Sequence, residues 1–173
     1  MSVRVERTRG ERDVVAIAEI DAASFPQTPP ADGAARSTPE ERVREELARP
    51  WTRAWVARED ERVVGYLLLW HVADELHILQ VATAATHRRK GFGRALVDET
   101  LAYAVAEHVR LVLLEVRRSN LAAIALYRRV GFVASHVRRG YYTDGEDAVE
   151  MLVELDPATG SRVSRVDEVR LDA

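Results

Sequence analysis

The feature that most constrains this sequence is a basic, glycine-containing loop between an apolar segment and a long amphipathic one. The loop is Arg88-Arg89-Lys90-Gly91-Phe92-Gly93-Arg94, and the segment before it is Leu76–Ala82. After the loop, apolar residues recur at helical spacing and predict a helix from about Gly93 to His108. The buried stripe of this helix is predicted to contain Val97, Leu101, Ala104 and His108. The region therefore predicts a strand, a glycine loop and a helix in direct succession.

A loop of this composition is suited to binding phosphate. Gly91 and Gly93 let a ligand approach the backbone closely, because no side chain is in the way. The N–H groups and the dipole at a helix start favour an anion, and the four cationic side chains strengthen that field. The spacing matches neither the dinucleotide-binding GxGxxG motif nor a P-loop. From these residues alone, a pyrophosphate site and an ordinary solvated turn both remain open.

The other segments predict a fold of alternating helices and strands. Asp13 is predicted to cap a first helix, which buries Val14, Ile17, Ala18 and Ala22. A second helix spans about Pro39–Ala48 after the capping box Thr38-Pro39-Glu40-Glu41. A further helix at 121–130 ends at Gly131, and strands are predicted at residues 3–5, 54–57, 62–72, 75–82, 111–116, 132–138 and 148–155. This order predicts an α/β (α+β) fold, in which a mixed sheet carries helices on both faces.

Length and composition narrow the class of protein. The 173 residues suffice for one domain, expected over residues 1–156, with a flexible Ala/Pro-rich loop at 26–38 and a polar, frayed tail at 157–173. The loop is either a linker or a substrate-side lid. A net charge of −3 argues against a general nucleic-acid binder, and no apolar run is long enough for a membrane span. The sequence has no cysteine and no signal-peptide core near Met1, so a cytoplasmic, reducing setting is expected.

Glu115 is the anomalous residue of the strand 111–116, which is otherwise almost wholly apolar and is expected to be buried on both faces. Burying a carboxylate is costly and favours its protonated form, and enzymes tune a general base in this way. Glu115 is therefore a candidate general base. The alternative is a glutamate at the end of a strand that pairs with Arg117 or Arg118.

Tyr127 lies two helical turns after Asn120, so that both side chains face the same side of the predicted helix. Tyr127 is either a proton donor to a leaving group or a core tyrosine, and Ser119 or Asn120 is expected to cap the helix.

Other polar residues carry weaker signals. His71 and His77 have no partner at metal-ligand spacing, so structural roles are expected for them and no metal site is predicted. Tyr141-Tyr142 lines a pocket or covers a sheet edge, and Arg138-Arg139 is expected to be a solvated pair.

Taken together, these residues resemble the GNAT superfamily of N-acetyltransferases. Arg88-x-x-Gly91-x-Gly93 after an apolar strand is similar to the acyl-CoA pyrophosphate loop of that family. The RimI-type ribosomal-protein alanine N-acetyltransferases are similar in the stretches Leu114–Tyr127, Gly131-Phe132, Arg138–Tyr142 and Asp144–Ala148. The resemblance covers roughly residues 62–155, and the N-terminal third matches only loosely.

The resemblance implies a GNAT-like, mostly antiparallel sheet of about seven strands, with acetyl-CoA as acetyl donor and no metal. It implies that backbone groups of Val81, Ala82 and Thr83 hold the pantetheine arm and the acetyl carbonyl. It assigns the coenzyme pyrophosphate to Arg88, Arg89, Lys90, Gly91, Phe92, Gly93 and Arg94, and a further coenzyme contact to Asn120. Glu115 is implied as the base and Tyr127 as the acid. The implied acceptor is the N-terminal α-amine of a ribosomal or other protein, with a small first residue, and the implied assembly is a monomer or weak dimer.

Departures from the family pattern concern the acceptor side. Ala84-Ala85 stands where family members usually carry Asp-Pro, and Gln27 stands where they carry tryptophan. The Asp-Gly segment after Tyr142 is shorter, and the Ala/Pro-rich insertion is extra. Because these changes cluster where the peptide is expected to bind, they bear on substrate choice more than on catalysis.

The expected chemistry is direct attack of an amine on the thioester, because the chain has no cysteine to carry an acetyl group. The attacking amine must be neutral. An α-amine with a pKa of about 8 is ~10% neutral at pH 7, whereas a lysine at about 10.4 is only ~0.04% neutral. The alternatives are a GNAT enzyme for small amines or lysine side chains and a non-catalytic acyl-CoA sensor. The presence of both Glu115 and Tyr127 argues against the sensor.

Overall fold

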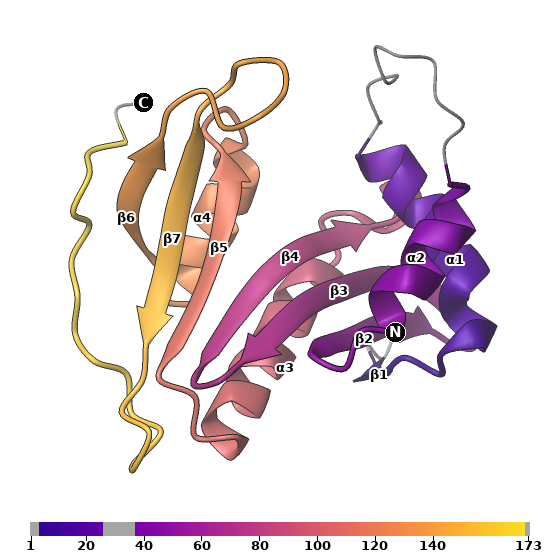
Figure 1. Cartoon of the computed structure of the whole chain (residues 1–173), viewed down its shortest axis with the longest axis horizontal. Helices are drawn as coiled ribbons and strands as arrows, with labels where there is room; N and C mark the ends of the chain where they lie inside the picture. Colours follow the sequence, from indigo (N-terminus) through magenta and orange to yellow (C-terminus); the bar gives the residue numbers. More distant parts are fainter. Residues whose placement is uncertain (1–3, 26–36, 172–173) are drawn as a thin grey trace. The chain divides into compact units, whose positions relative to one another are not determined.

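The computed structural model describes residues 4–25 and 37–171 (Figure 1). Gln27 and most of the predicted loop at 26–38 lie outside these residues, so their expected roles stay predictions. In chain order the elements are β1 (Arg4–Arg7), α1 (Glu11–Ser24), α2 (Pro39–Leu47), β2 (Thr52–Glu59), β3 (Arg62–Val72), β4 (Glu75–Thr83), η1 (Ala85–His87), α3 (Phe92–Ala106), β5 (Leu111–Arg117), α4 (Leu121–Arg129), β6 (Val133–Arg138) and β7 (Ala148–Glu154).

Within the described residues, the strands form a seven-stranded sheet in the order β1-β2-β3-β4-β5-β7-β6. β1 pairs with β2 in antiparallel fashion, and β7 is antiparallel to both β5 and β6. β4 and β5 are parallel, with Glu75–Ile78 opposite Leu111–Leu114. The predicted fold class, a mixed α/β protein with a mostly antiparallel sheet, is confirmed.

The chain forms two compact units. The first contains the residues up to Leu69 together with Gln80–Leu96. The second contains Trp70–Leu79 and the chain from Val97 onward. β3, β4 and α3 each contribute residues to both units.

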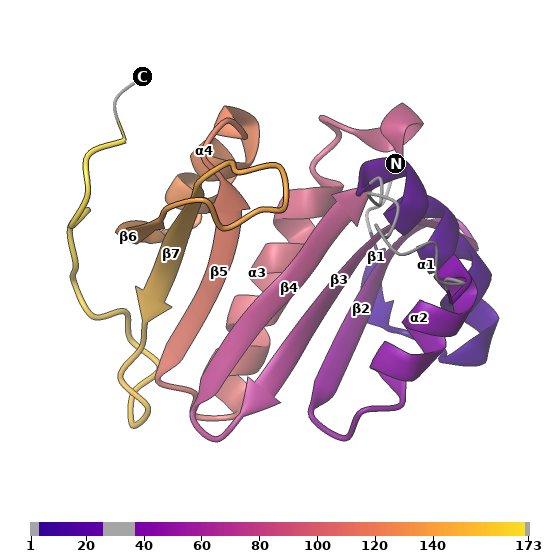
Figure 2. The same cartoon turned by 45° about the horizontal axis from the view of Figure 1, so that its top comes forward.

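The core of the first unit is built on α1 and α2, which lie side by side (Figure 2). The buried residues of α1 include Asp21. It lies seven residues after Val14 and therefore returns to the same face of the helix after two turns. Ala22 is turned away and exposed, so its predicted place in the buried stripe is wrong. The buried cluster of this unit includes Val14, Ile17, Ala18, Val43, Val56 and Tyr66.

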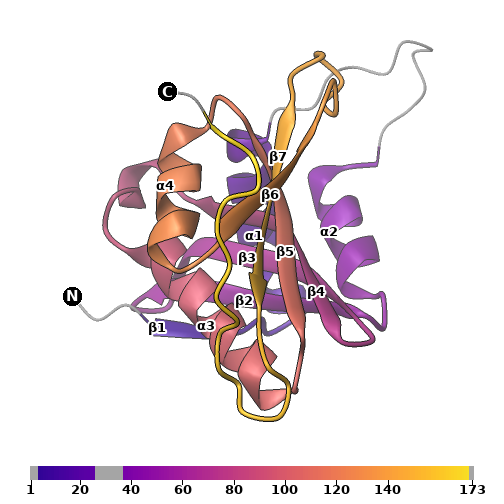
Figure 3. The same ribbon diagram turned by 90° about the vertical axis from the view of Figure 1, so that its left-hand side faces the viewer.

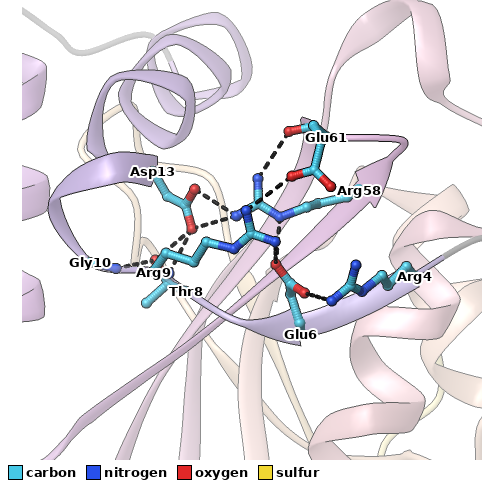
Figure 4. A network of polar contacts seen from close by, with 8 residues as sticks. All are labelled: Arg4, Glu6, Thr8, Arg9, Gly10, Asp13, Arg58 and Glu61. Atoms are coloured by element: carbon cyan, nitrogen blue, oxygen red, sulfur yellow. Dashed lines mark hydrogen bonds and ion pairs between the residues drawn. The ribbon is translucent and has the colours of Figure 1, made fainter.

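Asp13 does not cap α1, contrary to the prediction. The N-cap is Gly10, and Asp13 is the third residue of the helix and only 2% exposed. Its carboxylate accepts hydrogen bonds from Arg9 N at 2.7 Å and from Arg58 Nη2 at 2.7 and 2.9 Å (Figure 4). Arg58 is 3% exposed and also donates to Glu6 Oε1 at 2.7 Å. Burial opposes ionisation of Asp13, but the hydrogen bonds from Arg9 and Arg58 outweigh it and lower the pKa of the carboxyl.

α2 begins as the sequence predicts. Thr38 Oγ1 accepts from Glu41 N at 3.1 Å, and Glu41 Oε2 accepts from Thr38 N at 2.6 Å. This reciprocal pair is a capping box, and Pro39 occupies the first helical turn, where its missing N–H has no intrahelical partner to lose.

β5, in the second unit, is buried on one face rather than on both. Val112, Leu114 and Val116 are at most 6% exposed. The alternate residues Leu111, Leu113, Glu115 and Arg117 all keep partial contact with solvent. The expectation of burial on both faces is wrong, because an apolar sequence does not reveal whether anything covers the second face of a strand.

α3 ends two residues earlier than predicted. His108 has a φ of 56°, is exposed, and its Nδ1 lies 2.8 Å from Pro157 O, so its predicted place on the buried stripe is wrong. The residue after it, Val109, is buried instead, with an exposed fraction of 1%. At the end of α4, Gly131 has a φ of 95°, as its predicted position after the helix requires.

The C-terminal tail runs beside β6 and α4 and is not frayed within the described residues (Figure 3). Val163 N donates to Glu154 O at 2.9 Å, and Glu168 N donates to Ala134 O at 2.8 Å. Asp167 accepts from Ala134 N at 2.9 Å and forms an ion pair with Arg128. The polar composition predicted fraying, but these bonds attach the tail to β6, β7 and α4.

Candidate active site

The basic glycine loop lies in the first unit and leads directly into α3. Ala95 N donates to Gly91 O at 3.0 Å, so Gly91 caps the helix, and its φ of 90° suits glycine. Arg89 has a φ of 64°, a left-handed conformation that is costly for arginine. Phe92 is 3% exposed and anchors the loop. The helix start thus lies among four exposed cations, Arg88, Arg89, Lys90 and Arg94, as a phosphate site requires.

β4 reaches this loop through η1. Ala84 N donates to Val64 O at 2.8 Å, so the Ala84-Ala85 pair keeps the backbone tied to β3 without the family's Asp-Pro. A Cβ added to Gly65 would lie 3.0 Å from Ala82 O, which shows how closely β3 and β4 approach. The three residues whose backbone is assigned to the pantetheine arm, Val81, Ala82 and Thr83, are the last of β4.

A buried histidine that the sequence analysis missed supports the loop within the first unit. His87 is 8% exposed, and its Nε2 lies 3.0 Å from Glu59 Oε2. Its Nδ1 lies 2.8 Å from Thr86 Oγ1, and its ring packs against Phe92 with centroids 6.1 Å apart. Partners on both ring nitrogens fix the ring immediately before the loop begins. Glu59 lies 28 positions earlier in the sequence, so no local pattern could have found this pair.

Glu115 lies in the second unit, on the partly exposed face of β5, with its side chain 23% exposed. Its Oε1 accepts from Arg138 Nη1 at 2.6 Å. The expectation of a fully buried carboxylate is therefore wrong. The alternative partners, Arg117 and Arg118, bind Asp144, Glu146 and Asp147 instead.

Tyr127 is 7% exposed, and its ring packs against Phe132 with centroids 5.7 Å apart. Burial, together with the nearby Tyr142, raises the pKa of the Tyr127 hydroxyl to about 12. The hydroxyl therefore stays protonated throughout the neutral range. It can donate a hydrogen bond there, as the predicted acid must.

Tyr142 joins Glu115 and Tyr127 in one electrostatic neighbourhood of the second unit. Burial raises the pKa of the Tyr142 hydroxyl. The positive charge of Arg117 acts to lower this pKa, and the negative charge of Glu115 acts to raise it further. The Arg117 guanidinium lies 4.0 Å from the centre of the Tyr142 ring. Tyr141 packs edge-on against Tyr142, with centroids 5.2 Å apart.

Asn120 is the N-cap of α4, one of the two predicted caps, because its Oδ1 accepts a hydrogen bond from Ala123 N at 3.2 Å.

Hydrogen bonds from Ser119 and Arg117 hold the pKa of Glu146 at about 2. Beside the start of α4 lies a hollow of about 490 Å³, lined by Arg118, Ser119, Gly145, Glu146 and Asp147.

The two strand histidines have ordinary structural partners. His71 Nδ1 lies 2.8 Å from the Tyr103 hydroxyl, and His77 Nε2 lies 3.2 Å from Glu75 Oε2. Among residues 4–25 and 37–171, no group of three or more His, Cys, Asp or Glu side chains is placed to hold a metal ion.

The predicted site residues divide between the two units. Val81–Thr83 and the loop 88–94 belong to the first, and Glu115, Asn120 and Tyr127 belong to the second. Within the second unit, Tyr142 contributes to the raised pKa of Tyr127, and Glu115 contributes to the raised pKa of Tyr142. Two residues that were not expected to support the site also contact predicted site residues or flank the loop: Arg138 in the second unit and His87 in the first.

Residues 14–132 match the model of the acetyltransferase (GNAT) family. This chain belongs to that family. It is therefore an acetyltransferase by family, and the resemblance seen in the sequence is confirmed. The coenzyme and catalytic roles of its individual residues stay predictions.

Relatives of this GNAT chain include enzymes named for N-terminal acetylation. The Escherichia coli (strain K12) ribosomal protein bS18-alanine N-acetyltransferase is 34% identical over 123 residues, covering 62% of this chain and 83% of that one. An N-alpha-acetyltransferase of Sulfurisphaera tokodaii is 36% identical over 114 residues, covering 58% and 68%. The crystal structure of the ribosomal-protein-S18-alanine N-acetyltransferase from Escherichia coli superposes with a TM-score of 0.74 at 26% identity, covering 96% and 97% of the two chains.

In the part of the chain that the structure describes, no helix combines the length and the apolar character needed to cross a bilayer.

Proposed function

We propose that this GNAT chain transfers the acetyl group of acetyl-CoA to the N-terminal α-amine of a protein, in the cytoplasm. The proposed acceptor is a small-subunit ribosomal protein that begins with alanine. The observation that carries the proposal is the 34% identity to the Escherichia coli ribosomal protein bS18-alanine N-acetyltransferase over 123 residues. We further propose that residues 1–156 act as one catalytic domain.

We propose that the coenzyme is held by the loop of the first unit. The Gly91–Arg94 backbone at the start of α3 and the exposed cations around it would bind the pyrophosphate. Val81–Thr83 would bind the pantetheine arm through backbone groups. Asn120 uses its side-chain oxygen to cap α4, so its amide N–H group is the part left for the coenzyme.

We propose Glu115 as the general base. The amine nitrogen attacks the thioester carbonyl, the C–N bond forms and the C–S bond breaks, and Glu115 takes the proton that the nitrogen loses. At pH 7 an α-amine is ~10% neutral, so the carboxylate only has to take the proton that the amine loses during attack. A lysine side chain is only ~0.04% neutral, so nearly all of it would first have to lose another proton. This difference favours a peptide N-terminus over a lysine side chain as acceptor.

We propose that Tyr127 donates a hydrogen bond to the departing sulfur. The pKa of its hydroxyl is about 12, whereas an ordinary thiol titrates at about 8.5, so full proton transfer to the sulfur is uphill by about 3.5 pKa units. The hydroxyl therefore acts by stabilising the developing thiolate rather than by losing its proton completely. Its burial beside Phe132 keeps water from competing for this contact.

Replacing Tyr127 with phenylalanine is expected to lower kcat about tenfold to hundredfold and to leave the fold intact. The hydroxyl is lost but the ring that packs against Phe132 stays. Stopped-flow detection of coenzyme A release measures the change, and circular dichroism checks the fold. A kcat equal to that of the wild type would show that the sulfur leaves without help from Tyr127.

A substrate panel tests the proposed function. We expect acetylation of a peptide with a free N-terminal alanine, and at least about a hundredfold lower kcat/KM for the same peptide with a blocked N-terminus and one internal lysine, since the neutral fractions differ by more than that. Polyamines serve as the third arm. Preference for the lysine peptide or the polyamines would favour the alternative enzyme. Binding of acetyl-CoA by calorimetry without product from any amine would favour the acyl-CoA sensor.

A further inference from the structure

The geometry points to Arg138 as a displaceable counter-ion of Glu115, one that occupies the carboxylate before the acceptor binds and gives way to the acceptor amine. This inference rests on the proposed role of Glu115 as base and adds a specificity-determining residue to it. Arg138 Nη1 lies 2.6 Å from Glu115 Oε1, in a pair whose side chains are 46% and 23% exposed. Such a pair is accessible enough to exchange, because exposed ion pairs are weak.

The sheet register explains why Glu115 needs a cation. Glu115 on β5 lies directly opposite Glu150 on β7, and facing residues of antiparallel strands project to the same side. Two like charges at this separation repel each other. Glu150 accepts from Ser135 Oγ at 2.8 Å, whereas Arg138 supplies the compensating charge to Glu115. The arginine reaches Glu115 from β6, diagonally across β7.

Arg138 also contacts an aromatic ring of the same unit while it binds Glu115. Its guanidinium lies 4.8 Å from the centre of the Tyr141 ring, within the range of a cation–π contact. The ring contact does not depend on Glu115, so it still stabilises the charge of the arginine when the carboxylate is released. An acceptor amine reaches Glu115 Oε1 only by displacing Arg138, because the guanidinium already occupies that oxygen. Binding of the acceptor and pairing with Arg138 therefore compete for the same oxygen atoms.

Several other groups face Glu115 and share its electrostatic surroundings. Glu150 and His136 come from β7 and β6, where they lie opposite each other. Tyr142 comes from the segment before β7, and Arg117 lies two positions further along β5. β4 contributes His77, which is opposite Leu113 and bound to Glu75.

The first test asks whether the two side chains are coupled in the folded protein without substrates. In a double-mutant cycle of Glu115→Gln and Arg138→Gln, followed by urea unfolding, the losses of stability are expected not to add, because either change alone breaks the same ion pair. The matched control cycle pairs Glu115→Gln with Arg139→Gln, which removes the next, exposed arginine, and its losses are expected to add. Additive losses in the Arg138 cycle would overturn the pairing.

The second test separates a specificity role from a structural one by steady-state kinetics on the alanine peptide. Arg138→Gln is expected to lower the acceptor KM about threefold and to leave the acetyl-CoA KM unchanged. Arg138→Lys keeps the charge and is expected to restore the wild-type acceptor KM. A purely structural role would lower the unfolding temperature without moving the acceptor KM, and a raised acceptor KM would show that Arg138 recruits the acceptor instead. If Glu115 is not the base, Glu115→Gln retains the wild-type rate while its coupling to Arg138 persists, so failure of the proposed mechanism is distinguishable from failure of the pairing.

Discussion

Replacing Glu115 with glutamine is expected to lower kcat by about 10²- to 10⁴-fold, the range that a positioned general base contributes. Glutamine matches glutamate in size and can still accept a hydrogen bond from Arg138, so the β5 face keeps its shape. What it lacks is a site that takes the proton of the attacking amine. The measurement is single-turnover acetylation of an alanine peptide at saturating acetyl-CoA, because it isolates the chemical step from product release.

The matched control for this experiment is Glu150→Gln. Glu150 lies opposite Glu115 on the same face, so its replacement removes the same charge from the same part of the sheet. We expect its kcat to stay within a few-fold of the wild type. If Glu115→Gln reacts as fast as Glu150→Gln, the proton goes elsewhere, and Glu115 has no part in the reaction.

Replacing Arg58 with methionine is expected to destabilise the protein by about 3 kcal/mol or more. The variant leaves Asp13, which is 2% exposed, buried without its cation, and breaking a buried pair on one side typically costs about 3–5 kcal/mol. Glu6 loses its partner as well. Urea unfolding at pH 7, followed by circular dichroism, gives the difference in free energy of unfolding. The acetylation activity of the folded Arg58→Met variant shows whether it keeps a functional active site.

The double variant Asp13→Asn with Arg58→Met is the control for this prediction. It removes the buried charge together with its partner, so the loss of stability should be smaller than in Arg58→Met alone.

The pH dependence of the free energy of unfolding supplies a second check. The wild-type pKa of Asp13 is lowered, so its ionisation stabilises the fold above its unfolded value and this contribution fades as the pH falls below about 4. The difference between wild type and Arg58→Met should therefore shrink toward pH 4, and a difference independent of pH would show that lost packing, not charge, is the cause.

Local sequence patterns identified the elements well. The capping box at Thr38, the end of α4 before Gly131 and the helix after the glycine loop are confirmed because each depends on residues within one or two turns. The errors have one origin. Asp13 as a cap, His108 on the α3 stripe and β5 buried on both faces were all judged without knowledge of what packs against them.

The candidate site shows the same division. The glycine loop was found in the sequence because its glycines, its cations and the following helix are contiguous, and Glu115 was found because a charge interrupts an apolar strand. The partner of Glu115 could not be found, because Arg138 lies 23 positions away. The position of Arg138 also depends on a shift in the β6–β7 register between Ala134 and His136. Local patterns do not encode such a shift.

By itself, the sequence determined the order of helices and strands, and it pointed to the loop proposed to bind phosphate and to the two side chains proposed for proton chemistry. Periodicity, capping and composition act over a few residues and are visible in a linear chain. Only the tertiary structure decided which charges meet, namely Asp13 with Arg58, His87 with Glu59, and Glu115 with Arg138. Each of these contacts joins elements that are distant in the chain. Its geometry is set by strand register and helix packing, which depend on the whole core at once.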